Sequence, residues 1–141
     1  MKIIVDTNIA IDIMAHRDEF LDDSAKVFTF CCSGLIDGYF TASTFSDLHY
    51  ILKKHVYNED DIRNSLCFWM NFIGILDVDF EDCKKALRST MKDYEDALLS
   101  EVAKRHGVDY IVTRNVGDFK SSPVPAVTPK EFIPIAMRQN L

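Results

Sequence analysis

Four aspartates stand where the chain is expected to pass between strand and helix. Asp6 closes an apolar strand over residues 2–5, and Asp47 lies one turn into the helix after the second expected strand. Asp96 lies one turn into the helix before the fourth strand, and Asp118 follows that strand by a short loop. In an open parallel sheet, ligands bind at the carboxyl ends of the strands. We therefore expect the four carboxylates to converge at one edge of the sheet.

Carboxylates that converge in one crevice repel one another unless cations neutralise them. Mg²⁺ and Mn²⁺ suit such a site because both prefer hard oxygen ligands. Divalent ions of this kind activate water and stabilise the charge of an in-line displacement at a phosphate ester. The sequence lacks the G-x-S-x-G, G-x-x-x-x-G-K-[ST] and G-x-G-x-x-G motifs of other common sites. The residues thus favour metal-dependent phosphodiester chemistry without a side-chain nucleophile.

Each acid also has a purely structural interpretation. An acid three residues after an N-cap residue completes a capping box and complements the helix dipole. Three of the acids have this spacing: Thr44-x-x-Asp47, Asp93-x-x-Asp96 and Asn115-x-x-Asp118. Asp6 has no helix to cap unless it is itself an N-cap residue. The joint arrangement of the acids, more than any one of them, favours a functional site.

Strand-like and helix-like segments alternate along the whole chain. The expected strands are 2–5, 39–42, 75–78, 110–113 and a short 126–127. Four of the expected helices have clear ranges: 8–14, 21–32, 80–88 and 93–106. A further helix is capped by Ser43 or Thr44 and runs to about Lys54, and another is capped by Asn58. Thr128 and Pro129 open the last helix. This alternation predicts a single domain over 1–141. Its expected fold is a three-layer α/β/α sandwich around a mainly parallel sheet of four to five strands.

The composition is typical of one globular domain in the cytoplasm. The 141 residues are 48% hydrophobic and 27% charged, and the net charge of −6 weighs against simple groove binding to nucleic acid. Asp6 interrupts the first apolar run too early for a signal peptide, and no stretch reaches the ~20 apolar residues of a membrane span. No C-x-x-C pair occurs, so free thiols are expected and not a zinc site at the four cysteines, Cys31, Cys32, Cys67 and Cys83.

Three short motifs together resemble those of PIN-domain ribonucleases. They are Ile4-Val5-Asp6-Thr7-Asn8-Ile9, Tyr94-Glu95-Asp96-Ala97-Leu98 and Thr113-Arg114-Asn115-Val116-Gly117-Asp118-Phe119, in the family's order and spacing. The resemblance spans essentially the whole chain. It implies a PIN-like fold and a metal-dependent endoribonuclease that leaves 5′-phosphate and 3′-hydroxyl ends on RNA. Small stand-alone members are often VapC-type toxins, which are commonly homodimeric and bound by a small antitoxin protein.

The resemblance also implies roles for individual positions. Three match the family's acidic residues and would hold Mg²⁺ or Mn²⁺: Asp6, Asp96 and Asp118. Three match polar positions that orient those acids or water: Asn8, Thr113 and Asn115. Many members carry a glutamate in the helix after the second strand, where this chain has Asp47, so we include Asp47 among the catalytic residues with a side chain one methylene shorter. Asp93 lies on the same helical face as Asp96 and would supply a further carboxylate, although capping is the role we expect for it.

Two other functions remain open on the sequence. A PIN fold whose acids are no longer catalytic would act as a binding module through protein or RNA contacts, although the near-complete set of acids argues against this. A receiver-like signalling domain would need a phosphoryl-accepting aspartate after the third strand, such as Asp77 or Asp79. The paired acids and the lysine that such a domain also needs are missing, so this alternative fits poorly.

Aromatic and basic residues outside the motifs carry weaker signals. Three aromatic residues with helical spacing indicate core or dimer contacts before base stacking: Phe68, Trp69 and Phe72. A few basic residues are candidates for contacts with substrate phosphates: Lys53, Lys54, Arg114 and Lys120. They are too few to define a nucleic-acid surface.

Overall fold

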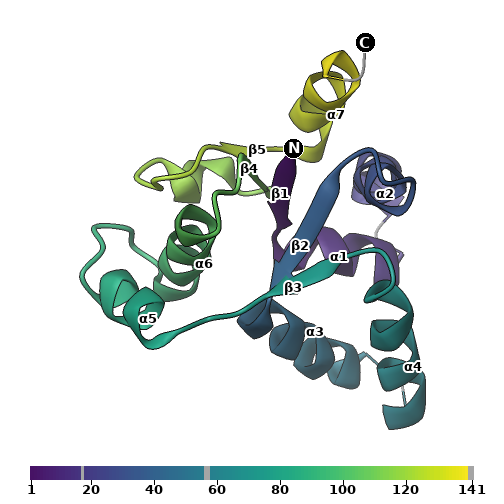
Figure 1. Ribbon diagram of the computed structural model, residues 1–141. Coiled ribbons are helices and arrows are strands. Elements are labelled where there is room, and N and C mark those ends of the chain that lie inside the picture. The colour runs from purple at the N-terminus through teal and green to yellow at the C-terminus, as the bar shows by residue number, and fades with distance from the viewer. Residues whose placement is uncertain (17, 56–57, 140–141) are drawn as a thin grey trace.

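A five-stranded parallel sheet forms the centre of the computed structural model, which describes residues 1–16, 18–55 and 58–139. The strands are β1 (Lys2–Val5), β2 (Asp37–Thr41), β3 (Gly74–Leu76), β4 (Tyr110–Val112) and β5 (Ala126–Val127). Their order is β3-β2-β1-β4-β5, and every neighbouring pair is parallel (Figure 1). The chain moves outward from β1 to β3 and then crosses back to β4. The topological switch point, where open parallel sheets bind ligands, therefore falls between β1 and β4.

Strand β1 is central because its side chains are apolar on both faces. Ile3, Ile4 and Val5 are fully buried, and β1 pairs with β2 on one side and β4 on the other. Successive side chains of a strand point to opposite faces, so Ile3 and Val5 pack into one core cluster and Ile4 into a second. Burial on both faces explains why this segment is a continuous apolar run.

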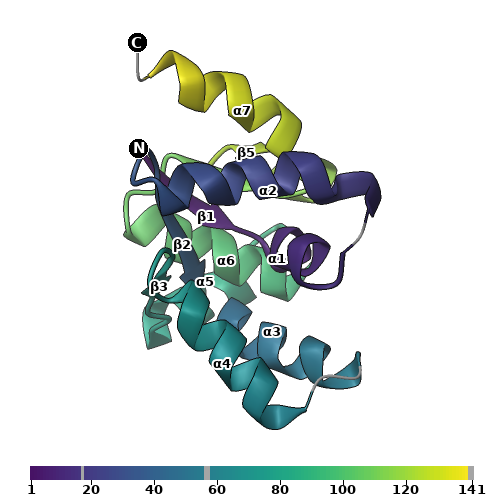
Figure 2. The same cartoon turned by 90° about the vertical axis from the view of Figure 1, so that its right-hand side faces the viewer.

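Helices cover both faces of the sheet. They are α1 (Thr7–Met14), α2 (Asp18–Cys32), α3 (Ala42–Lys54), α4 (Glu59–Trp69), α5 (Phe80–Leu87), α6 (Tyr94–Arg105) and α7 (Pro129–Arg138), with a 3₁₀ segment, η1, at Val116–Phe119. One core cluster contains residues of α1 to α4 and α7, and the other contains residues of α6 and η1. Figure 1 shows α5 and α6 on one side of the strands, and Figure 2 shows α7 beside α2. The predicted three-layer α/β/α fold is confirmed.

The start of α3 differs from the prediction. We expected Ser43 or Thr44 to cap this helix, but the N-cap is Thr41, whose hydroxyl oxygen accepts the Thr44 backbone N–H at 3.0 Å. The helix therefore begins at Ala42, directly after β2. Because Asp47 then lies in the second turn, Thr44-x-x-Asp47 is not a capping box. The carboxylate of Asp47 projects from the body of the helix and not from its end.

Other boundaries differ by one to three residues, among them the start of α2 and the end of β3. Helix α2 begins at Asp18, three residues before its predicted start, because Asp18 and Glu19 complement the positive end of the helix. Strand β3 ends at Leu76 and not at Val78, because it is an edge strand with one neighbour and the chain turns toward Asp79, the N-cap of α5.

The four cysteines are free thiols, as predicted. None of the helices in the described part of the chain is long and apolar enough to cross a membrane.

A cluster of ion pairs fixes the segment that follows β3. Arg105 of α6 binds Asp82 at 2.8 Å and Asp77 at 3.1 Å. Asp79 caps α5 in a full capping box with Asp82. Asp77 is therefore engaged by Arg105, and Asp79 caps α5, and both follow an edge strand. The receiver-like alternative needs one of them as an open phosphoryl acceptor, and this arrangement does not support it.

Candidate active site

Asp6 lies at the carboxyl end of β1, at the switch point of the sheet, and is held by three hydrogen bonds. One carboxylate oxygen accepts the Thr7 backbone N–H at 2.8 Å, and Asp6 is the N-cap of α1. The other accepts the Thr113 hydroxyl at 2.8 Å and the Asn8 amide at 3.2 Å. Burial raises the pKa of Asp6 above its ordinary value, and these donors partly oppose that shift. Asp6 is thus a helix cap whose position is fixed from several directions.

Thr113 links the segment after β4 to Asp6. Its side chain is fully buried, its hydroxyl donates to Asp6, and the same oxygen accepts the Asn115 backbone N–H at 3.1 Å. The side-chain oxygen of Asn8 accepts the Arg114 backbone N–H at 3.5 Å. Two of the predicted supporting residues, Asn8 and Thr113, therefore contact Asp6 directly. Asn115 is linked to it indirectly, through the hydrogen bond from its backbone N–H to Thr113.

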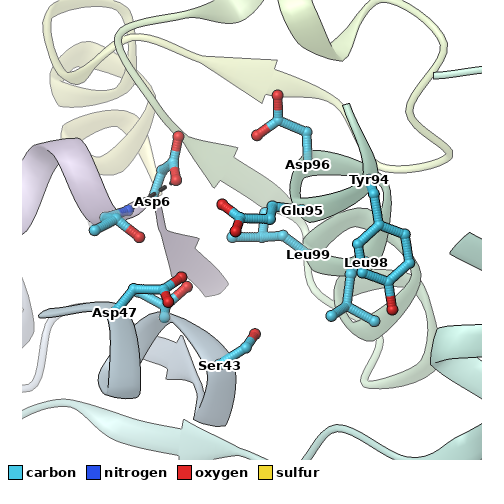
Figure 3. Close-up of a pocket in the computed structure, with 10 residues that line it drawn as sticks. Asp6, Ser43, Asp47, Tyr94, Glu95, Asp96, Leu98 and Leu99 are labelled. Atoms are coloured by element: carbon cyan, nitrogen blue, oxygen red, sulfur yellow. Dashed lines mark hydrogen bonds between the residues drawn. The ribbon is translucent and has the colours of Figure 1, made fainter. Parts of the chain in front are cut away.

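Two cavities open at this edge of the sheet, and they share five lining residues: Asp6, Thr7, Asp47, Glu95 and Asp96. The Tyr94 cavity, of about 240 Å³, is completed by Ser43, Thr44, Tyr94, Leu98 and Leu99. The Tyr50 cavity, of about 520 Å³, is completed by Asn8, Ile11, Tyr50, Ile51 and Asn115. Figure 3 shows the acids of α6 on one wall and the remaining acids on the other. Three of the four predicted acids are thus brought together here.

Asp96 stands in the first turn of α6 and has a pKa raised to about 7. Burial is the largest cause, followed by the negative charges of four neighbouring acids: Asp6, Asp93, Asp118 and Glu95. The Asp93 carboxylate accepts the Asp96 backbone N–H at 3.0 Å, so Asp93 is the N-cap, as expected. Only this half of the predicted capping box forms between these two described residues. The carboxylate of Asp96 is therefore not used to cap the helix.

Asp118 lines neither of these two cavities. It is exposed on η1 and lines, with Asp93 and Asp96, a third cavity of about 590 Å³ that we call the Lys120 cavity. Its charge nevertheless helps to raise the pKa of Asp96. Asn115 precedes η1 but makes no side-chain capping bond, so the predicted box is not formed between these two described residues. Asp96 is the acid that connects Asp118 with the rest of the site.

Glu95 is an acid of the site that the sequence analysis did not single out. It lines both the Tyr94 and the Tyr50 cavity. Its pKa is raised first by the nearby charge of Asp47, then by burial and by the charges of Asp93 and Asp6. Glu95 therefore faces Asp47 across the site. One feature of the sequence could have pointed to Glu95. It is the neighbour of Asp96 in the first turn of a helix, and adjacent residues there can line the same crevice.

The basic residues suggested for phosphate contacts are only partly available. Arg114 pairs with the buried carboxylate of Asp12 at 3.0 Å, and its guanidinium lies 4.2 Å from the ring centre of Phe20. The ammonium of Lys54 lies 4.3 Å from the ring centre of Tyr50. Lys120, by contrast, lines the third cavity beside Asp118. Arg114 thus serves the packing of α1 and α2 against the segment after β4.

The donor set suits a hard divalent cation. Carboxylate oxygens gather here, and their mutual repulsion contributes to the raised pKa of Asp96 and Glu95. A divalent cation would offset that repulsion, and Mg²⁺ and Mn²⁺ prefer oxygen donors. Within residues 1–16, 18–55 and 58–139, no three His, Cys, Asp or Glu side chains are close enough together to hold a metal ion. Ligation by three residues therefore requires side-chain rotations from the positions seen here.

Several solved structures have the same fold as this chain. VapBC2 from Rickettsia felis, bound to a DNA fragment from its promoter, matches with a TM-score of 0.70 at 14% identity, over 91% of this chain and 98% of that chain. A toxin–antitoxin complex from Klebsiella pneumoniae matches with a TM-score of 0.66 at 23% identity, over 89% and 96%. VapC20 from Mycobacterium tuberculosis, described as a sarcin–ricin loop cleaving toxin, matches with a TM-score of 0.62 at 11% identity, over 77% and 86%.

A family model adds to this structural likeness. None of the curated proteins is similar enough in sequence to be matched to this chain. The model described as PIN domain, however, matches residues 2–117, which include Asp6, Asp47 and Asp96. The match covers most of the chain and includes the first two of the three motifs in full, and it ends at Gly117, one residue before Asp118 of the third motif. The chain belongs to the PIN-domain family.

Proposed function

We propose that this chain is a metal-dependent endoribonuclease that hydrolyses RNA phosphodiester bonds. The observation that carries the proposal is the meeting of Asp6 and Asp96 in both cavities at the carboxyl edge of the sheet. Membership of the PIN-domain family supports it, as does the fold shared with a toxin described as cleaving the sarcin–ricin loop.

Asp6, Asp96 and Asp118 are the residues that would hold Mg²⁺ or Mn²⁺. When bound, such a cation lowers the pKa of water and offsets the charge of a phosphate under attack. Thr113 and Asn8 hold one carboxylate oxygen of Asp6 in place, which limits the reorganisation needed on binding.

Asp47 and Glu95 would act as a pair of outer acids. They face each other from α3 and α6, and each lines both cavities. Asp47 occupies the place where many family members have a glutamate, and its shorter side chain reaches less far into the site. Glu95 supplies that reach from the opposite wall. The pair would accept protons or hold water beside the substrate phosphate.

Cleavage of a randomised pool of single-stranded RNA in Mn²⁺ tests the proposal. We expect the wild type to produce new 5′-phosphate ends, and Asp6→Asn and Asp96→Asn to abolish them while still unfolding cooperatively. Asp60→Asn is the matched control, because Asp60 is exposed in the first turn of α4 and lines no cavity of the site. Unchanged cleavage in either acid variant would contradict the proposal. Metal binding by a wild type that cuts no RNA would favour the binding-module alternative.

We also propose that the chain is a cytoplasmic toxin that forms a homodimer and binds a small antitoxin. The toxin–antitoxin complexes among its structural neighbours support this. Trp69 packs on Phe28 in the core, whereas Phe68 and Phe72 are 58% and 38% exposed, with their ring centres 5.3 Å apart. Light scattering should give twice the mass of the chain, and Phe68→Glu should give the monomer mass. A monomeric wild type would contradict the dimer.

A further inference from the structure

The Tyr94 cavity contains a surface that phosphodiester hydrolysis alone does not require. Its acidic end is formed by carboxylates such as Asp6 and Asp96, which the proposed function uses. Its other end is formed by Tyr94 with the buried side chains of Leu98 and Leu99 (Figure 3). A cation and a phosphate need oxygen ligands and positive charge, not an aromatic and aliphatic wall. This end therefore suits a flat, apolar part of the substrate.

Tyr94 is held at the cavity by two elements. Its backbone is the first residue of α6, and Leu98 lies one turn further along the same side of the helix. Its hydroxyl lies near the Cys83 thiol of α5, and this neighbour is the main cause of a raised pKa of Tyr94. The side chain as a whole is 41% exposed. The ring thus stands beside the cavity with part of its surface accessible.

We propose that this end of the Tyr94 cavity binds one nucleobase of the RNA strand, next to the scissile phosphate, and that Tyr94 stacks on that base. The inference rests on the proposed ribonuclease function. The whole cavity, with its acidic end, has a volume of about 240 Å³, below the ~300–1,000 Å³ of sites for drug-sized ligands, so its apolar end holds at most a single base. Proteins recognise single-stranded RNA by stacking unpaired bases on aromatic rings. The hydroxyl of Ser43, 3.0 Å from that of Thr41, adds a polar group at the cavity.

Tyr50 is the competing aromatic residue, and the structure favours Tyr94 over it. Tyr50 is 61% exposed and lines the larger cavity on α3. The ammonium of Lys54 covers its ring at 4.3 Å from the ring centre, so a base on that face would have to displace the lysine. Tyr94 has no such cation over its ring among the described residues. The base is therefore assigned to the Tyr94 side of the carboxylates.

The test uses the short RNA that the wild type cuts best from the randomised pool, made with an intact base or an abasic site at each nucleotide flanking the cut. Loss of one flanking base should lower wild-type kcat/KM by about 5- to 150-fold, the range expected for base–aromatic stacking. Tyr94→Ala should cause the same loss on intact RNA and lose nothing further on abasic RNA. Tyr94→Phe should behave as the wild type, because the ring remains. The RNA affinity of the Asp96→Asn variant, measured by fluorescence anisotropy, should follow the same pattern without turnover. It should fall when the base is removed, fall equally with Tyr94→Ala, and fall no further when the two changes are combined.

Phe80→Ala is the matched control, because Phe80 is 76% exposed on α5 and lines none of the three cavities. It should leave both RNAs unaffected. The inference is overturned when Tyr94→Ala still discriminates fully against the abasic RNA, or when Tyr50→Ala removes that discrimination instead. Failure of the proposed function itself has a different signature, because the wild type would then cut no RNA of the pool, and the inference would fall with it.

Discussion

At the residue scale, the charge that would hold a cation destabilises the metal-free chain. The pKa of Asp96 is raised to about 7 by burial and by the charges of Asp6 and other acids, so its ionised form is less favourable in the folded chain than in the unfolded one. This loss of folding free energy is absent below about pH 4, where the carboxyl is protonated in both the folded and the unfolded chain. It grows as the pH rises above the ordinary value of 3.8 and is complete above about pH 7.

Asp96→Asn should therefore raise the free energy of unfolding of the metal-free chain at pH 8. We expect a gain of roughly 1–2 kcal/mol, because each pKa unit corresponds to ~1.36 kcal/mol and solvent screens part of the effect. The gain should shrink at pH 6 and vanish near pH 4, as measured by urea unfolding in a chelator. Asp60→Asn should show no such dependence. If the variant were no more stable than the wild type at pH 8, burial and the neighbouring acids would not destabilise the ionised Asp96 as we infer.

Site residues at strand ends were the predictable ones. Asp6, Asn8 and Thr113 lie at or just past the ends of β1 and β4, and the register of parallel strands brings those ends together. Glu95 was not predictable in the same way. The direction of a side chain in a first helical turn depends on how α6 is tilted against the sheet, and a linear pattern does not encode that tilt.

At the element scale, periodicity predicted which elements exist, but caps decided where they begin. Thr41, Ser43 and Thr44 all have side chains that suit an N-cap. The ladder between β2 and β3 extends to Thr41, so the chain is extended up to that residue and can turn directly into α3. Choosing among three suitable caps requires the strand register, which depends on residues distant in the sequence. For this reason Asp47 lies in the second turn of α3 and not in the first turn, where the predicted cap would have placed it.

Arg105 of α6 binds the buried carboxylate of Asp82 in α5 and so links the two helices. Burial raises the pKa of Asp82, but hydrogen bonds from Arg105 and from Asp79, together with the positive charge of Arg105, more than offset this and leave the pKa below its ordinary value. Arg105→Ala would leave the carboxylate of Asp82, which is 2% exposed, without its cation. We expect a loss of about 2–3 kcal/mol in urea unfolding at pH 7, since removing one partner of a buried pair is costly. Because the lowered pKa stabilises the fold only above the ordinary value, the difference from wild type should fall as the pH drops through that lowered pKa.

Arg63→Ala is the matched control for Arg105→Ala. Arg63 pairs with Glu59 at 2.8 Å, but its side chain is 72% exposed, so its removal should cost well under 1 kcal/mol. Equal losses in the two variants would show that the contact between Arg105 and Asp82 is no stronger than a surface ion pair.

At the scale of the whole molecule, the proposed function requires a chain with a net charge of −6 to bind a polyanion. Lysine and arginine contacts to phosphates make RNA affinity fall steeply with monovalent salt, with a slope of about 0.7 per contact for single strands. A carboxylate site bridged to the phosphate by a divalent cation needs few such contacts. The candidates beside the site are Lys92 and Lys120, which line the Lys120 cavity together with Asp118. An RNA strand that leaves the carboxylates along this cavity would place its next phosphates near these two lysines.

The salt dependence of RNA affinity should therefore be shallow and should depend on these two lysines. With the acids of the site intact, an RNA that is non-hydrolysable at the cut and Mn²⁺ held constant, the double variant Lys92→Ala, Lys120→Ala should lower the slope of log Kd against log KCl by about 1.4, which corresponds to two phosphate contacts. Lys26→Ala, exposed on α2, should leave the slope unchanged, because Lys26 lines none of the three cavities at the carboxylates. The same slope in the double variant and in Lys26→Ala would mean that the strand leaves the site by another route. A steep slope in every variant would mean that monovalent cations, and not the carboxylate-bound divalent ion, balance the charge between this acidic chain and RNA.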